Sequence, residues 1–217
     1  MGINAASSPC PLCAAESGFY HRDSRRSYHR CIRCHLIHVP PSYRPSAEEE
    51  KAQYDLHQNN PQDSGYRQFL SRLTGPLLAK LNSHSHGLDY GCGPGPTLSV
   101  IMEEAGHSMA LHDPFFHPNP DAFNEFYDFI TATEVFEHLH QPARDLEILF
   151  KALKPNGWLG IMTKRTHDKE AFSKWHYIQD PTHVCFWSQQ TFHWLAQQWH
   201  ATTEFPAPDV VLIQRNP

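Results

Sequence analysis

Short apolar runs and helix-like segments alternate through the second part of the chain, from Gly87 onward. The runs predict strands near residues 87–90, 108–113, 127–132 and 158–163, and a terminal pair near 202–206 and 209–215. Between them, apolar residues spaced three and four apart predict helices over residues 96–106, 142–154 and 188–199. This order predicts an α/β fold with a Rossmann-like, mostly parallel sheet and a terminal antiparallel strand.

Upstream of this region, the stretch YRQFLSRLTGPLLAKL (66–81) follows a helical pattern. Its apolar residues fall near one face: Phe69, Leu70, Leu73, Leu77, Leu78 and Leu81. The pair Gly75–Pro76 predicts a break in this helix. In the later helix, Pro142 marks the first turn, and the KPNG that follows predicts a turn into the next strand.

The composition of the 217 residues is that of a globular protein, with 40% hydrophobic and 19% charged residues. No apolar run approaches the roughly 18 residues of a membrane span, and the start lacks a secretory pattern, so we expect a cytoplasmic protein. Residues 1–46 carry a net charge of +4 and the remainder −9. This distribution argues against a long basic surface that binds nucleic acid. The seventeen histidines mostly lack the spacing of metal ligands.

Two cysteine pairs stand in the first part of the chain, Cys10–Cys13 in CPLC and Cys31–Cys34 in CIRC, with 17 residues between them. This spacing predicts a four-cysteine zinc ribbon, in which the metal supplies folding energy that so small a segment lacks. Redox-active pairs and disulfides are the alternatives, and His35 or His38 could replace one cysteine. We expect Cys92 and Cys185 to be packed thiols. The chain then divides into a ribbon (1–46), a helical linker or lid (47–85) and a catalytic domain (86–217).

The glycine loop GLDYGCGPGP carries glycines at positions 91, 93 and 95, which is tighter than the G-x-G-x-x-G of dinucleotide folds. Asp89 beside the loop would repel a pyrophosphate but would favour a ligand with a positive amino group. S-adenosylmethionine carries an ammonium, a sulfonium and no phosphate. Asp113, at the end of the next strand, can accept hydrogen bonds from both ribose hydroxyls.

Four blocks in this region look like successive motifs of class I S-adenosylmethionine-dependent methyltransferases: LDYGCGPG, HDPFF, YDFITATEVFEHLHQP and LKPNGWLGIM. The resemblance covers residues 87–163 in the family's order. It implies that Asp89, Gly91, Cys92 and Gly93 line the methionine end of the cofactor. It also implies that Asp113 binds the ribose, that Thr131–Thr133 lie beneath the methionine, and that Glu137–His138 sit near the catalytic floor.

The resemblance leaves one gap between Asp113 and Tyr127, where family members carry a helix and a third strand. Only residues 114–126 are available, and FFHPNPDAF reads as loop, so the third strand is expected to be very short or missing. The adenine contacts are therefore open, with Asp121, Phe115 and Phe116 as candidates.

Acceptor-side candidates come from the stretch WHYIQDPTHVCFWS (175–188), which follows the WLGIMT strand. His183 and His176 are candidate catalytic bases there, beside Asp180, and His138 is a third candidate. The alternative for each is a structural role in a turn or at a helix start. A second part of the site is expected before the sheet, formed by Tyr54, His57, Asn59 and Tyr66. We expect the Tyr66 hydroxyl to reach the carboxylate of the cofactor. The alternative is that this segment is only a surface loop.

Three functions fit these observations. The first is a methyltransferase that acts on an unidentified, small-molecule acceptor. The second is a zinc-ribbon RNA methyltransferase whose basic ribbon binds RNA phosphates. The negative net charge of the rest of the chain argues against this function. The third is a non-catalytic interaction protein on the same scaffold, which intact Asp89, Gly91, Gly93 and Asp113 oppose. The sequence does not identify the acceptor atom or the oligomeric state.

Overall fold

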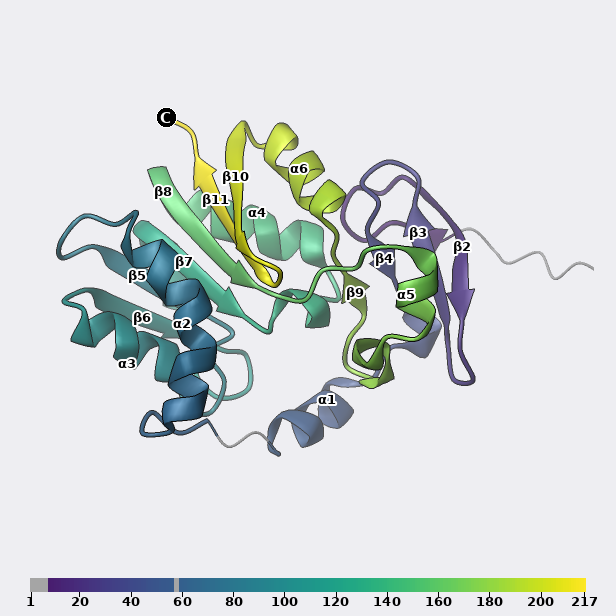
Figure 1. Ribbon diagram of the computed structural model, residues 1–217, viewed down its shortest axis with the longest axis horizontal. Helices are drawn as coiled ribbons and strands as arrows, with labels where there is room; N and C mark the ends of the chain where they lie inside the picture. The colour runs from purple at the N-terminus through teal and green to yellow at the C-terminus, as the bar shows by residue number, and fades with distance from the viewer. Residues whose placement is uncertain (1–7, 57–58) are drawn as a thin grey trace, which may run out of the picture.

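The computed structural model describes residues 8–56 and 59–217, and Figure 1 shows two groups of strands joined by helices and loops. The larger group is a central sheet of six strands: β5 (His86–Tyr90), β6 (Ser108–His112), β7 (Tyr127–Thr133), β8 (Leu153–Met162), β10 (Ala201–Ala207) and β11 (Val210–Arg215). Their order is β10-β11-β8-β7-β5-β6. The last four are mutually parallel, whereas β11 runs antiparallel to both β8 and β10. The predicted α/β fold is confirmed.

The third strand of the fold is missing, as the short loop predicted. Between β6 and β7 the chain makes one isolated bridge, Asp113 to His117, and the 3-10 helix η2 (Pro120–Asn124). Strand β6 therefore forms the edge of the central sheet. Thirteen residues are too few for the helical crossover that a further parallel strand would need.

Helices cover both faces of the sheet, because side chains along each strand point alternately to the two sides. Phe129, Trp158 and Leu212 pack on one face with α2 (Ser64–Leu78) and α3 (Thr97–Glu104). Ile130, Leu159 and Ile213 pack on the other with α4 (Pro142–Ala152) and α6 (Gln189–Gln198). In Figure 1 the first pair lies in front of the sheet and α4 lies behind it.

Two local predictions were wrong. Helix α2 continues through Pro76 to Leu78, so the predicted break at Gly75–Pro76 does not occur. Leu77, beyond the proline, is fully buried against the sheet, and this packing outweighs the missing backbone donor. The KPNG segment is an irregularity inside β8 and not a separate turn, because pairing with β7 resumes at Trp158 after Leu153.

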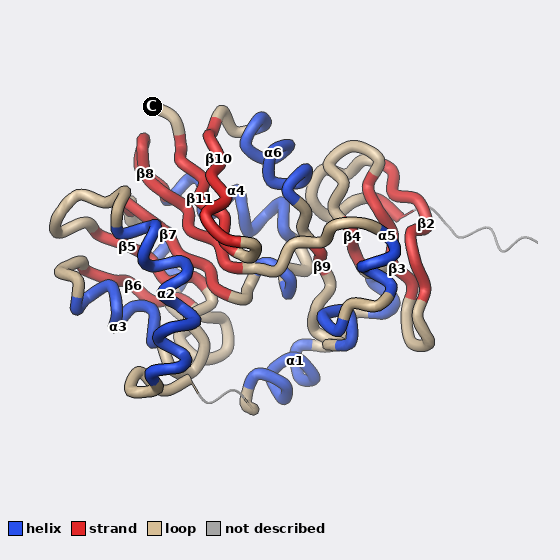
Figure 2. Tube along the Cα trace, in the orientation of Figure 1, coloured by secondary structure: helices blue, strands red, loops and turns tan. Residues whose placement is uncertain are grey.

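The smaller group of strands contains the four cysteines and is completed from far along the chain. Strands β1 (Ser8–Pro9), β2 (Glu16–Arg22), β3 (Ser27–Cys31) and β4 (Ile37–His38) are antiparallel, and β9 (Cys185–Phe186) pairs with β4. Figure 2 shows β9 beside β4 at the edge of this sheet. The buried side chains of the ribbon continue into the core of the central sheet as one cluster. The ribbon is thereby packed onto the segment that follows β8.

Short helices line the side where the parallel strands end: η1 (Pro41–Tyr43), α1 (Ala47–Tyr54), η3 (Phe136–His138), α5 (Lys169–Ser173) and η4 (His176–Gln179). A capping box between Ser46 and Glu49 starts α1. Within the described ranges, no helix has the length and apolar character required to traverse a membrane.

Candidate active site

Asp89 lies near the carboxyl end of β5, in the centre of the parallel strands, and is only 2% exposed. The Thr131 hydroxyl on neighbouring β7 donates to its carboxylate at 2.9 Å. Burial raises the pKa of Asp89 to about 7; the Thr131 hydrogen bond opposes this rise and the charge of Asp113 adds to it. A buried carboxylate of this kind is stabilised in its charged form by a cationic ligand.

The glycine loop follows β5 in a conformation that its glycines allow. Gly91 and Gly93 have φ of +72° and +66°, in the left-handed region. A Cβ on Gly91 would also lie 2.5 Å from a methyl group of Val135. The Cys92 thiol between them is buried and faces the Gly93 carbonyl at 3.7 Å, so it is a packed thiol that lines the loop.

Asp113 follows β6 and links the glycine loop to the end of that strand through hydrogen bonds. Its carboxylate accepts backbone N–H bonds from Gly93 at 3.0 Å, Phe115 at 2.8 Å and Phe116 at 3.0 Å. A carboxylate oxygen has two lone pairs, so Asp113 retains acceptor capacity for hydroxyl groups. Asp121 lies exposed on η2.

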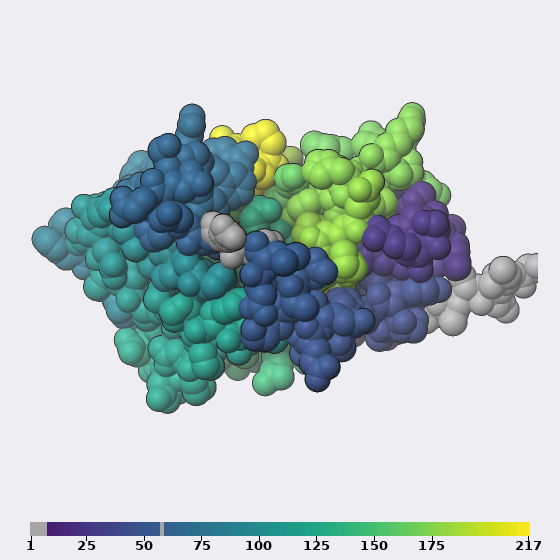
Figure 3. All heavy atoms as spheres, turned by 90° about the horizontal axis from the view of Figure 1, so that it is seen from below, coloured from purple at the N-terminus to yellow at the C-terminus, as the bar shows by residue number. Residues whose placement is uncertain are grey.

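The segment before the sheet closes over the loop from the other side. A Cβ on Gly95 would lie 2.0 Å from the Asn59 carbonyl oxygen, so the chain passes directly over Gly95. Figure 3 shows this face, with α1 between the glycine-loop side and the side that carries η4. Burial raises the pKa of Tyr66 on α2 to about 12, and the charges of Asp89 and Glu134 add to it. His57 lies outside the described residues.

Thr133 ends β7 half-buried, and the residue after it, Glu134, is a further candidate site residue that was not predicted from the sequence. Glu134 has φ of +53°, a strained conformation for a non-glycine residue that is typical of functional positions. Burial raises the pKa of Glu134 to about 8; the charge of Glu137 adds to the rise, and Lys164 opposes it. Its position at the end of a parallel strand, before the EH pair, is the signal that could have identified it.

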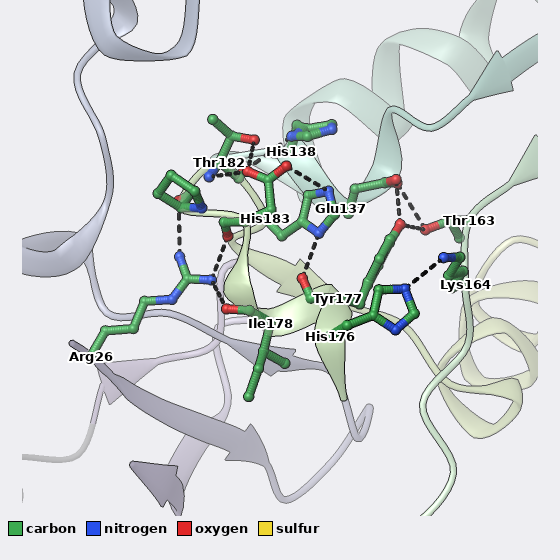
Figure 4. Close-up of polar contacts among 12 residues, drawn as sticks. Arg26, Glu137, His138, Thr163, Lys164, His176, Tyr177, Ile178, Thr182 and His183 are labelled. Carbon is green, nitrogen blue, oxygen red and sulfur yellow. Dashed lines mark hydrogen bonds and ion pairs between the residues drawn. The ribbon is translucent and has the colours of Figure 1, made fainter. Parts of the chain in front are cut away.

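Glu137, His138 and His183 come together beyond the ends of β7 and β8 (Figure 4). One ligand-type atom from each lies within 4.8 Å of the others. The rings of the two histidines have centroids 4.8 Å apart. Glu137 is fully buried, and its carboxylate accepts hydrogen bonds from the hydroxyls of Tyr177 and, at 2.8 Å, Thr163.

Backbone carbonyls fix the tautomers of both histidines. The Nδ1 atom of His138 lies 3.1 Å from the Thr182 carbonyl, and that of His183 lies 2.8 Å from the Tyr177 carbonyl. Because a carbonyl only accepts, Nδ1 carries the proton and Nε2 keeps its lone pair. Burial lowers the pKa of His183, and the charge of His138 adds to this effect.

His176 is not brought into this group. It is exposed on η4, and its Nε2 lies 3.1 Å from the Lys164 amine. Tyr54 on α1 does lie against the group, with its ring centroid 5.3 Å from His138 and 5.8 Å from Phe115. Helix α1 therefore lies against both the loop that follows β6 and the histidines.

A cavity of about 320 Å³ opens beside Lys164, a volume suited to a small molecule. Basic and aromatic side chains dominate its lining, which comprises Arg72, Lys164, Arg165, Thr166, His167, Ala171, Phe172, Trp175, Pro208 and Asp209. Asp209 pairs with Arg72 at 2.8 Å. The charges of Arg72, Lys164 and Asp209 act on Glu134, which places the cavity next to the end of β7.

A buried arginine of the ribbon holds the loop that leads to His183. The Arg26 guanidinium, 4% exposed, donates to the carbonyls of Pro181 at 2.8 Å, Ile178 at 2.9 Å and Asp180 at 2.7 Å (Figure 4). Its Nε donates to the Tyr28 hydroxyl at 2.9 Å. All three loop carbonyls are thus satisfied by one side chain from another part of the chain.

The four ribbon cysteines come together, with the sulfur atoms of Cys10 and Cys34 3.5 Å apart and those of Cys13 and Cys31 3.4 Å apart. All six cysteines are free thiols. Sulfur atoms bound tetrahedrally to zinc at about 2.3 Å lie roughly 3.8 Å from one another, so the donor set fits zinc. His38 instead bonds Ser17 at 2.9 Å.

Replacing Arg26 should destabilise the protein strongly. We expect Arg26→Ala to lower the free energy of unfolding by about 3–5 kcal/mol, because three carbonyls lose a charged donor. Chemical denaturation measures this change. The matched control is Arg25→Ala, which removes from an exposed residue one part-buried hydrogen bond of 3.3 Å to the Ile178 carbonyl and should cost under about 1 kcal/mol. Equal effects of the two substitutions would show that the loop does not depend on Arg26.

Comparison with known proteins agrees with this geometry. No curated protein sequence matches the chain. The 1,6-didemethyltoxoflavin-N1-methyltransferase of Burkholderia thailandensis has a similar structure, with a TM-score of 0.50 and 15% identity over 92% of this chain and 99% of that one. A methyltransferase of Haloferax volcanii solved with the Trm112 methyltransferase activator gives a TM-score of 0.50 and 13% identity, over 78% and 98%. A Methanosarcina mazei methyltransferase gives 0.50 and 12%, over 65% and 97%.

The sequence profile described as "Methyltransferase domain" matches residues 62–199, which include α2, the glycine loop, Asp113, the EH pair and His183. The matched region is well over half of the chain. The chain therefore belongs to the methyltransferase domain family, among the class I S-adenosylmethionine-dependent methyltransferases.

Proposed function

We propose that this protein transfers the methyl group of S-adenosylmethionine to a small-molecule acceptor. The observation that carries the proposal is the meeting of two sets of side chains at one edge of the sheet. Asp89, the glycine loop and Asp113 form the first set, and His138 and His183 form the second. A methyl donor on the first set would face an acceptor on the second, which is the arrangement that in-line displacement needs.

On the cofactor side, Asp89 would attract the ammonium and sulfonium, and Asp113 would bind the ribose hydroxyls. The close backbone at Gly91, Cys92 and Gly93 would cradle the methionine end. Thr131 and Thr133 would lie beneath it, with Thr131 fixing the Asp89 carboxylate. Tyr66 would close this part of the site from α2.

On the acceptor side, the sulfonium already activates the methyl carbon. The acceptor's lone pair forms the new bond to that carbon, the carbon–sulfur bond breaks, and its electron pair stays on sulfur as neutral S-adenosylhomocysteine. An acceptor hydroxyl must also lose its proton, and the Nε2 lone pairs of His138 and His183 are placed to assist this loss. His176 lies apart from these two histidines and contacts Lys164, which lines the cavity.

The cavity beside Lys164 favours an acceptor with an anionic group on a planar body. Arg72, Lys164, Arg165 and His167 outnumber the acidic Asp209, and Phe172 and Trp175 provide apolar surface. Its volume of about 320 Å³ suits a small molecule better than a polymer. The similar Burkholderia enzyme was solved with bound 1,6-didemethyltoxoflavin, which supports a small acceptor.

The ribbon would bind one structural zinc ion. Four thiolates fill a tetrahedral site and leave no position for substrate, so this ion would stabilise the ribbon and take no part in transfer. Reduced thiols are also typical of the cytoplasm, where we place the protein.

Cofactor affinity should depend on pH through Asp89. The cationic cofactor favours the carboxylate, so affinity should rise with pH up to about 7 and level off above that value. Below that value the loss approaches about tenfold per pH unit. Isothermal titration with S-adenosylmethionine measures this profile. Asp89→Asn should weaken cofactor binding and flatten its pH profile. Glu103→Gln, at an exposed position of α3, should leave the affinity and the profile unchanged. An unaltered profile in Asp89→Asn would remove Asp89 from the cofactor site.

Transfer itself is tested with labelled S-adenosylmethionine and a fractionated cell extract. We expect label in the small-metabolite fraction, and about a hundredfold less with His183→Ala, because the acceptor-side group is lost. Label in RNA would point to the zinc-ribbon RNA methyltransferase. Cofactor binding without label in any fraction would favour a non-catalytic scaffold.

Metal analysis of the purified protein tests the ribbon. We expect at least one zinc ion per chain, and one fewer in Cys34→Ser because a tetrahedral site needs all four thiolates. Cys92→Ser, which changes a buried thiol elsewhere, should have the zinc content of the parent. An unchanged zinc content in Cys34→Ser would contradict the four-cysteine assignment.

A further inference from the structure

The buried carboxylate of Glu137 is held without a cation. Its two hydrogen bonds come from the neutral hydroxyls of Thr163 and Tyr177, and among the described residues no Lys or Arg forms an ion pair with it. An ionised carboxylate that is fully buried costs several kcal/mol unless a positive charge compensates it. Among the described residues, Glu137 therefore has no Lys or Arg that would compensate its charge in the ionised form.

Asp180 adds a second negative charge beside the same group. Its Oδ2 lies 3.7 Å from His183 Nε2, while its Oδ1 accepts hydrogen bonds from the backbone and side chain of Thr182. The Arg26 guanidinium donates to the backbone carbonyls of this loop, that of Asp180 included. Lys164 lies over the Tyr177 ring and beside His176.

The two histidines have the hydrogen-bonding pattern of metal ligands. A histidine that binds a metal through one ring nitrogen usually donates its other N–H to a carbonyl or carboxylate, which fixes ring orientation and tautomer. Both His138 and His183 do this, through Nδ1 to backbone carbonyls. The Nε2 atom of each ring then remains as the possible ligand atom, and that of His183 lies 3.7 Å from Asp180 Oδ2 (Figure 4).

We propose that Glu137, His138 and His183 bind a divalent first-row transition-metal ion, a second metal site separate from the ribbon. Two imidazole nitrogens and one carboxylate suit zinc, iron, cobalt or manganese, and three protein ligands leave positions open. An ion with bonds of about 2.1 Å needs ligand atoms roughly 3–4 Å apart. The ligand-type atoms here lie within 4.8 Å of one another.

The role of this ion rests on the proposed function, although its binding does not. An acceptor hydroxyl on an open position would bind through oxygen, and the ion would lower the pKa of that hydroxyl. The proton leaves to water or to Asp180, and the oxygen lone pair then forms the bond to the methyl carbon as the carbon–sulfur bond breaks. The acceptor is then an oxygen nucleophile, and the two histidines act as ligands in place of bases.

Manganese titration of the full-length protein holding one equivalent of zinc, which the four thiolates bind first, is followed by electron paramagnetic resonance of free Mn²⁺ and tests the site. Thiolates are poor ligands for Mn²⁺, so the ribbon does not compete. We expect one Mn²⁺ per chain, with affinity at least about tenfold lower in Glu137→Gln, His138→Gln and His183→Gln. His193→Gln, an exposed histidine on α6, is the matched control and should bind like the parent.

Circular dichroism melting of each variant identifies any that fails to fold. Should Glu137→Gln unfold because its carboxylate is buried, the two histidine variants decide the result. No bound Mn²⁺ at millimolar concentration, or equal binding by folded histidine variants and the parent, would overturn the proposal. The titration contains no S-adenosylmethionine, so its failure leaves cofactor binding and the proposed methyl transfer untouched, and loss of cofactor binding leaves the metal result intact.

Discussion

The contact between the Arg26 guanidinium and three loop carbonyls joins the two halves of this molecule. Residues 178–181 are separated from Arg26 by more than 150 positions, yet one buried side chain satisfies their carbonyl oxygens. Strand β9 continues from this loop and pairs with β4 of the ribbon. His183 stands between these two attachments, so its position depends on the ribbon being folded.

Four carboxyl groups gather at the edge of the sheet beyond the parallel strands. Asp89, Asp113, Glu134 and Glu137 follow or end neighbouring strands, and burial raises the pKa of Asp89 and Glu134. Ionised carboxylates that lie buried and close together are unfavourable unless cations bind beside them. A cationic methyl donor would compensate the charge at Asp89, and the proposed metal ion would compensate that at Glu137. The same physical requirement thus underlies both proposals.

Local signals predicted the central sheet well. The strands at residues 87–90 and 127–132 were found because their apolar runs are short and bounded by glycine or polar residues, and the missing third strand followed from the length of 114–126. The structure also keeps Asp89 and Asp113 at neighbouring strand ends. The histidine pair was predicted residue by residue, but its meeting with Glu137 required the fold.

Contacts distant in sequence were beyond prediction. Strand β9 has only two residues and no periodicity, and its partner β4 lies about 150 residues away. Arg26 carries no local signal, because the carbonyls that it binds belong to a distant loop. The break expected at Pro76 did not occur because burial of Leu77, which local propensity cannot show, keeps α2 continuous.

We infer that the folded ribbon holds residues 178–188, which include His183, in place. Hydrogen exchange of zinc-loaded and zinc-stripped protein measures this dependence, by comparing amide protection in residues 178–188 with that in β5 and β7. Removing zinc should expose the amides of residues 178–188 together with those of β2 and β3, while β5 and β7 stay protected. If β2 and β3 lose protection and residues 178–188 do not, the ribbon does not hold this segment.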